Sequence, residues 1–245
     1  MKKLFLFAAS VLATVSVSAA TVEVAAGQDL QAAINGASAG DVVKVQAGTF
    51  TGNFTMKEGV NVSGGWNETF TTQSDFATVL DANANGRVLN QPADFTTVTV
   101  WSNLTIQNGY LAAQQGDQQA AGAVLKRLGR LVHCLVQNNN VAASGTFMGG
   151  GVASNTGMAN PDTVVIDCII RNNKASHGGG MRTNGKGMVI LNSVIENNET
   201  TNNAAGGLQM HNGGTIQGCV VRGNKANGDT GGIRLTGGNV ATVSN

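Results

Sequence analysis

A repeat in the second half of the chain limits its fold more than any other feature. Four segments run small residue, two apolar residues, polar residue, then Asn or Gly, and the small residues are Cys134, Cys168, Ser193 and Cys219. These positions are 34, 25 and 26 residues apart. Self-similarity at a period of roughly 20–50 residues is typical of repeat proteins, in which each unit buries its apolar face against the next.

A second marker keeps the same phase. It is a Gly-Gly pair followed by an apolar residue, at 150–152, 179–181, 206–208 and 231–233. The steps are 29, 27 and 25 residues. Two markers in one phase establish the repeat.

The repeated unit is built from short strands. Residues 165–171 alternate with period two and are rich in β-branched side chains, and Asn, Gly and Ser lie between such segments. No amphipathic helical segment separates them, a propeller blade needs about 40–45 residues, and a leucine-rich repeat needs a ladder of Leu that is absent. The sequence therefore predicts an all-β parallel β-helix with two or three short strands per coil.

Stacked columns of like residues follow from this fold. The inward apolar column is expected to be Val136, Ile170, Ile195 and Val221, beside a column of the small residues. An amide ladder is expected at the turn from Asn138, Asn172 and Asn197, interrupted by Gly223. The Gly-Gly pairs are expected to permit a tight corner.

The composition agrees with this fold and excludes others. Only 12% of the 245 residues are charged, with 34 Gly and 2 Pro. This argues against charged helices, coiled coils, acidic disordered tails and collagen. A net charge of +1 gives no excess of basic residues for binding nucleic acid, so we expect no nucleic-acid partner.

The first 20 residues have the layout of a secretory signal peptide. Lys2 and Lys3 precede an apolar run over 4–17, and 17–20 form a small-residue cleavage site after Ala19 or Ala20. The alternative is a buried first helix. Apart from this segment, no run of 18 apolar residues predicts a membrane span. We expect a bacterial protein that is secreted or held at the outer membrane or cell surface.

The β-helix is expected over residues 21–245. An amphipathic helix at 29–34 precedes a strand at 42–45 and can cap the open end of the first coil. By the repeat phase the sequence stops in mid-coil at Asn245, so we expect the domain to be incomplete at that end.

The residues also resemble a known superfamily. Segments 31–34, 40–43 and 47–50 look like the opening of right-handed parallel β-helix proteins of the pectin-lyase-like superfamily, and 64–67 and 78–81 resemble their next coils. Later coils, such as 170–181, are similar to repeats of bacterial polymorphic outer-membrane proteins, although Ile or Val stands in place of the Phe of those repeats. The resemblance implies a right-handed helix and an exported, adhesin-like or structural passenger.

An enzyme is the main alternative, because the superfamily includes polysaccharide lyases and glycoside hydrolases. The sequence offers no matching catalytic motif: 176–178 and 183–185 differ from the expected elements, and the acidic residues are scattered over different coils. His177 and His211 fit no metal motif. We expect no catalytic site, no metal and no cofactor.

A candidate binding surface follows the Gly-Gly-apolar marker. The next residues are Ala153, Arg182, Gln209 and Arg234, which should face solvent on one sheet. Arg182, Gln209 and Arg234 could bind a carbohydrate, an acidic partner or a ligand on a host or cell surface; the alternative is ordinary solubilising polarity. Trp66 and Trp101 offer sugar-stacking rings or core packing.

The cysteines leave two alternatives open. Cys134 and Cys168 lie in successive coils and are within disulfide range. Free thiols in a small-residue column are favoured, because Ser193 takes the same position.

Overall fold

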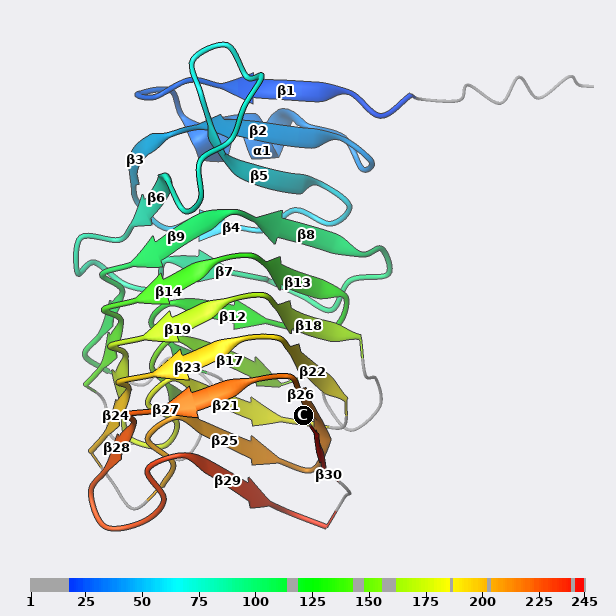
Figure 1. Ribbon diagram of the computed structural model, residues 1–245. Helices are drawn as coiled ribbons and strands as arrows, with labels where there is room; N and C mark the ends of the chain where they lie inside the picture. Colours follow the sequence, from blue (N-terminus) through cyan, green and yellow to red (C-terminus); the bar gives the residue numbers. More distant parts are fainter. Residues whose placement is uncertain are drawn as a thin grey trace, which may run out of the picture.

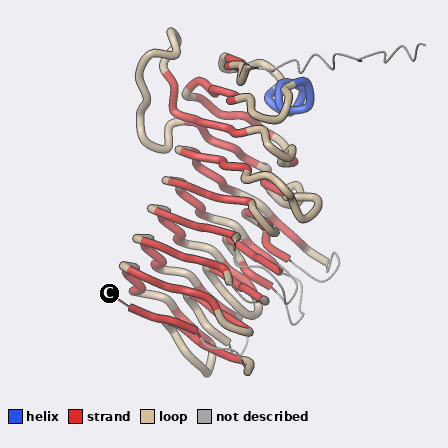
Figure 2. The backbone as a smooth tube through the Cα atoms, turned by 90° about the vertical axis from the view of Figure 1, so that its right-hand side faces the viewer, coloured by secondary structure: helices blue, strands red, loops and turns tan. Residues whose placement is uncertain are grey.

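The structure is a computed structural model that describes residues 18–113, 119–142, 148–155, 162–185, 187–201, 204–238 and 241–244. Over this part the chain is a parallel β-helix, in which strands of each coil pair in parallel with strands of the coils on either side (Figure 1). Figure 2 shows the coils stacked in one column with the helix at one end. The predicted parallel β-helix is confirmed, and its right-handed sense stays a prediction. The expectation of two or three strands per coil was wrong, because short two-residue strands at the turns bring the later coils to four or five. Most of the expected signal peptide, residues 1–17, lies outside the described residues.

Three long parallel sheets, named A, B and C, form the walls. In the described part sheet A has nine strands: β1 (Thr21–Val24), β2 (Val42–Gln46), β5 (Asn61–Trp66), β8 (Thr99–Ser102), β13 (Gly129–Val132), β18 (Thr163–Ile166), β22 (Met188–Leu191), β26 (Gly214–Gln217) and β30 (Ala241–Ser244). Sheet B has seven: β3 (Gly48–Thr51), β6 (Thr78–Asp81), β9 (Leu104–Gln107), β14 (Leu135–Gln137), β19 (Ile169–Arg171), β23 (Val194–Glu196) and β27 (Val220–Arg222). Sheet C also has seven: β4 (Phe54–Thr55), β7 (Leu89–Asn90), β12 (Ala123–Leu125), β17 (Val152–Asn155), β21 (Met181–Asn184), β25 (Leu208–His211) and β29 (Ile233–Thr236).

Two smaller sheets lie between sheets B and C along the chain. Sheet D holds β10 (Tyr110–Leu111), β15 (Asn140–Val141), β20 (Lys174–Ala175), β24 (Glu199–Thr200) and β28 (Lys225–Ala226). Sheet E holds β11 (Gln119–Ala120) and β16 (Met148–Gly149).

The apolar column predicted from the repeat lies in the core. Val136 pairs with Ile170, and the same register continues through Ile195 to Val221. Val136, Ile170 and Ile195 are fully buried. Like side chains stack on like because each coil presents the same position to its neighbour.

The coils bend at residues with left-handed backbone. Between sheets A and B these are Asn103, His133, Asp167, Asn192 and Gly218, with φ between 47° and 62°. Between sheets B and D they are Asn108, Asn138, Asn172, Asn197 and Gly223, with φ between 53° and 62°. Asn, Asp, His and Gly tolerate this conformation better than other residues, which explains why the repeat keeps them there.

The amide ladder lies one residue further along the chain than predicted. Its members are Asn139, Asn173, Asn198 and Asn224, and the Nδ2 group of each of the first three donates to Oδ1 of the next at 2.9–3.0 Å. Each Oδ1 also accepts a backbone N–H from the coil before. Each Nδ2 also donates to a main-chain carbonyl.

Asn138, Asn172 and Asn197 instead occupy the exposed left-handed corner. Gly223 takes the same corner with φ 62°, so it does not interrupt the ladder. The expectation was wrong by one position because both asparagines of each Asn-Asn pair recur with the same period, and the sequence alone does not show which one faces inward.

The Gly-Gly pairs provide space rather than unusual backbone angles. Gly151, Gly180 and Gly207 do not have positive φ. A Cβ added at Gly180 would lie 2.7 Å from the carbonyl oxygen of Gly207 and 2.8 Å from Nδ2 of Asn198. The second glycine is therefore needed at Gly151, Gly180 and Gly207, because the amide ladder and the next coil occupy the space that a side chain would take, whereas at Gly232 the nearest atom, Cγ1 of Val221, would lie 3.9 Å away.

The predicted capping helix is confirmed as α1 (Leu30–Gly36). The Asp29 carboxylate accepts the Ala32 N–H at 2.9 Å, which caps its first turn. Leu30 and Ile34 are buried in the core beneath it. Strand β1 pairs with β2 at the same end of the stack.

The three cysteines are free, as favoured from the sequence. Cys134 and Cys168 are buried in the predicted small-residue column with Ser193. Burial raises the pKa of the Cys168 thiol, which disfavours the thiolate there. No helix among the described residues is long and apolar enough to cross a membrane.

We predict that Asn173→Ala destabilises the fold by about 3 kcal/mol or more. It removes the acceptor of the Asn139 N–H and Nδ2 groups, the side-chain donor to the Val136 carbonyl oxygen and one of the two donors to Oδ1 of Asn198, and each buried group left without a partner costs about 1–3 kcal/mol. Urea unfolding measures the change. Asn172→Gly, which removes an exposed amide at a left-handed corner, should change stability by less than about 0.5 kcal/mol. Equal effects of the two substitutions would contradict the ladder.

Candidate functional site

The structure brings the three predicted binding residues into one row. Arg182 on β21 pairs with Gln209 on β25, which pairs with Arg234 on β29. Neighbouring parallel strands lie about 4.8 Å apart, so the three side chains leave the outer face of sheet C from successive coils. The predicted stacking of these three positions on one sheet is confirmed, and their binding role stays a prediction.

Their expected exposure is wrong for two of the three. Arg182 and Gln209 are each only 5% exposed, and the related residue Ala153 is 2% exposed. The Arg234 side chain is 36% exposed and is the accessible member of the row.

A layer of chain lies over the start of sheet C. Ala120 of β11 packs in a buried cluster with Val124 and Ala153 on the outer face of this sheet. Isolated bridges extend the same layer from Gly149 through Gly178 to Ala205. These segments carry no strand pattern of their own, so the sequence does not show that the sheet is covered here.

A second outer row adds a histidine to the arginines. His211 follows Gln209 by two residues, and its Nδ1 lies 2.9 Å from Oγ1 of Thr236. Burial, and then the positive charge of Arg182, lower the pKa of His211 below its ordinary value.

The arginines also influence one another. Burial lowers the pKa of Arg182 to about 10, and the nearby charge of Arg234 acts in the same direction. Arg234 forms an ion pair with Asp229 at 3.2 Å. Oε1 of Gln209 is buried with no hydrogen-bond partner among the described residues. These residues together provide two arginines, a histidine, the free amide oxygen of Gln209 and one carboxylate. Such a set of groups suits a ligand that carries acidic and hydroxyl groups.

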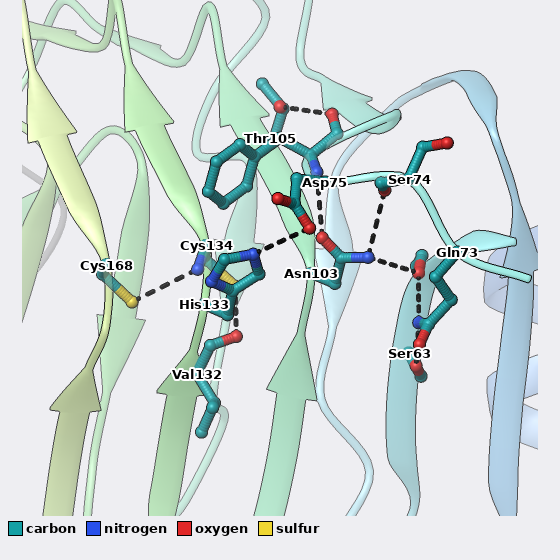
Figure 3. Close-up of polar contacts among 12 residues, drawn as sticks. Ser63, Gln73, Ser74, Asp75, Asn103, Thr105, Val132, His133, Cys134 and Cys168 are labelled. Atoms are coloured by element: carbon teal, nitrogen blue, oxygen red, sulfur yellow. Dashed lines mark hydrogen bonds and ion pairs between the residues drawn. The ribbon is translucent and has the colours of Figure 1, made fainter.

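A different polar cluster fastens the loop between β5 and β6 (Figure 3). Asn103 donates to the carbonyl oxygens of Gly64 and Ser74, both at 3.1 Å, and accepts the Phe76 N–H at 2.9 Å. The loop also reaches sheet A through Asp75, whose carboxylate lies 3.1 Å from Nε2 of His133. Sequence reasoning missed this contact because Asp75 and His133 belong to different coils.

The cluster has no catalytic geometry despite containing Asp75, His133 and Cys134. His133 faces solvent and stacks on Phe76, with ring centroids 4.7 Å apart. Cys134 is fully buried, and its Sγ donates to the carbonyl oxygen of Val132 at 3.4 Å. His133 is the left-handed corner residue between β13 and β14, with its ring on the outside of the coil, whereas the Cys134 thiol lies in the core, so the imidazole is not placed to activate this thiol. The arrangement is structural.

Most carboxylates of the described residues also have structural partners. Glu196 pairs with Arg222, Glu199 pairs with Lys174, and Asp81 is held by the amides of Gln107 and Asn108. Hydrogen bonds lower the pKa of Glu58. Burial acts to raise the pKa of Asp81, but side-chain amide and backbone donors outweigh it, so this pKa is lowered as well. A general acid for glycoside cleavage needs a raised pKa, which these groups do not provide.

Two further expectations concern metals and tryptophans. No group of three or more His, Cys, Asp or Glu within the described ranges could hold a metal ion.

Trp101 is fully buried, so its core alternative is correct. Trp66 is half-buried, and the ammonium group of Lys44 lies 4.0 Å from its ring centroid.

Comparison with known proteins finds only distant structural resemblances. No protein-family profile matches the sequence, and no curated protein matches it. Among solved structures, a pectin methyl esterase of the rice weevil is 13% identical to this chain, with a TM-score of 0.45. The match covers 91% of this chain and 89% of the esterase. A pectate lyase is 15% identical with a TM-score of 0.36, covering 94% of this chain and 79% of its own. The resemblance to outer-membrane repeats stays a prediction.

We predict that Arg182→Gln raises the pKa of His211 part of the way toward about 6.5, because one of its two causes is removed. NMR titration of the imidazole, assigned with His211→Gln, measures this. Arg222→Gln, on sheet B, should leave it unchanged. With the pKa of His211 lowered in the folded state, the unfolded chain binds more protons below about pH 6.5, so this group costs stability as the pH falls through that range. An unaltered His211 titration in Arg182→Gln would contradict the coupling.

Proposed function

We propose that the chain is an exported, non-enzymatic β-helix protein of the adhesin-like kind that binds an acidic carbohydrate on the outer face of sheet C. The observation that carries this proposal is the in-register row of Arg182, Gln209 and Arg234. The row gathers positive charge on a chain whose net charge is only +1. A rigid solenoid suits such a role because it presents a row of side chains at fixed spacing.

Exposure assigns different parts to the three residues. Arg234, 36% exposed, is the group that meets the ligand, and half-buried His211 lies beside it. Arg182 and Gln209 lie behind them, where low dielectric strengthens the effect of a fixed charge. Asp229 holds Arg234 in place at 3.2 Å without cancelling the charge of Arg182.

A polysaccharide lyase or glycoside hydrolase is less well supported. Acid–base cleavage of a sugar needs two carboxyl groups facing one bond. Glu196 and Glu199, on neighbouring strands, are each bound to a basic side chain, and Asp229 is bound to Arg234. The row on sheet C is basic rather than acidic, which favours binding over cleavage.

We predict that the purified chain binds polygalacturonate and alginate but not neutral dextran, and that added salt weakens the binding because it screens charge. Arg234→Gln should weaken binding about tenfold, since a charge-assisted hydrogen bond contributes about 1.5–3 kcal/mol. Calorimetric titration measures both effects.

Arg222→Gln is the matched control. Arg222, like Arg234, is ion-paired to one carboxylate, but it lies on sheet B. An equal loss of affinity in both variants, or equal binding of dextran, would refute the site. Cleavage of polygalacturonate into shorter products would favour the enzyme instead.

Export has its own support in the fold. The first backbone hydrogen bonds of the described chain are made by Ala20, and strand β1 begins at Thr21, directly after the expected leader. We predict that the full chain, expressed in a bacterium, is recovered outside the cytoplasm without its first 19 or 20 residues. Intact-mass measurement and amino-terminal sequencing test this. A chain that keeps Met1 and stays in the cytoplasm would contradict export.

A further inference from the structure

One buried carboxylate near the start of the β-helix is aimed at the backbone of the expected cleavage site. Asp41 is 6% exposed. Its Oδ1 accepts the Ala20 N–H at 2.8 Å, and its Oδ2 accepts the Ser38 N–H at 2.7 Å. These two backbone hydrogen bonds are the largest causes of its lowered pKa, so the group is a carboxylate at neutral pH.

The carboxylate has no ion-pair partner within the described residues. The nearest basic side chain to act on it is Lys57, whose Nζ instead donates to the carbonyl oxygens of Asn35 and Ala37. A buried carboxylate without a cation is costly unless it is well hydrogen-bonded or paired. The position that could supply a cation is the backbone nitrogen of Ala20.

We propose that the leader is removed between Ala19 and Ala20, and that the α-ammonium group created there forms an ion pair with Asp41. This inference rests on the proposed export of the chain. Hydrolysis by a leader-removing endopeptidase adds one water molecule across the Ala19–Ala20 peptide bond. Ala19 leaves as a carboxylate, and the proton released by its carboxyl group is taken up by the new amine of Ala20.

The structure distinguishes the two cleavage positions that the sequence left open. The carbonyl oxygen of Ala20 accepts the Val42 N–H at 2.9 Å, which starts the pairing of β1 with β2. Cleavage after Ala20 would remove both this bond and the donor to Asp41. Cleavage after Ala19 keeps both and replaces a neutral N–H donor with a charged one, which forms a stronger hydrogen bond.

The ion pair is tested on purified chains that begin at Ala20. One form keeps its free amine and the other is acetylated enzymatically at that amine alone, and both are unfolded with urea at pH 7. We expect acetylation to lower the folding equilibrium constant about tenfold, the equivalent of one unit of amine pKa. In the Asp41→Asn background acetylation should change it less than about twofold. Equal stability of the two forms, or the same acetylation effect with Asn at position 41, would overturn the pairing.

The pH dependence is a second test that does not need the Asp41 variant to fold. The pair raises the folded-state pKa of the amine above its usual value of about 7.7–8.0, so its stabilisation is complete below that range and is lost as the pH rises through the folded value. A chain that begins at Ala19, with its amine one residue away, should lack this loss. The same pH profile for both chains would overturn the pairing.

Sequencing of the exported protein tests the cleavage position separately. An amino terminus at Ala20 is expected, and one at Thr21 would overturn the proposed position. Retention of the leader would refute export itself, whereas the urea experiments on the purified chains would still decide the ion pair.

Discussion

The buried amide ladder is the interaction on which the other parts of the coil depend. Each Asn side chain from Asn139 to Asn198 satisfies its own polar atoms, a backbone N–H of the coil before it and a main-chain carbonyl. An uncharged core can hold these groups because none is left without a partner. The neighbouring position is then limited to glycine, as the space beside Gly180 shows. The two sequence markers of the repeat are therefore the two sides of one packing arrangement.

The candidate site depends on a different constraint, the layer of chain over sheet C. Next to this layer the Arg182 guanidinium group is held out of water, with the residue only 5% exposed. Its pKa falls to about 10, and its charge lowers the pKa of His211. Burial of charge outside the core of a solenoid has a cost that folding alone does not explain, and this supports a binding role for the row.

The repeat predicted the fold well because the period of the sequence is the period of the structure. The inward column of Val136, Ile170 and Ile195, the free thiols and the capping helix all follow from local pattern and spacing. The ladder was misplaced by one residue, since Asn138 and Asn139 are equally periodic and only the backbone turn at Asn138 decides which amide faces inward. The burial of Arg182 and the contact between Asp75 and His133 depend on loops that pass between coils, and periodicity carries no information about such loops.

The ladder also has a direction. The backbone N–H of Asn139 and its Nδ2 group both donate to Oδ1 of Asn173, and the same two bonds recur from Asn173 to Asn198 and from Asn198 to Asn224. Each coil thus presents two donors, the backbone N–H and the Nδ2 group of its ladder Asn. The next coil in the chain supplies the Oδ1 atom that accepts both. Chains are synthesised from the amino terminus, so earlier coils exist first and can act as templates for later ones. The direction of the ladder therefore favours the addition of coils in the order in which they are made.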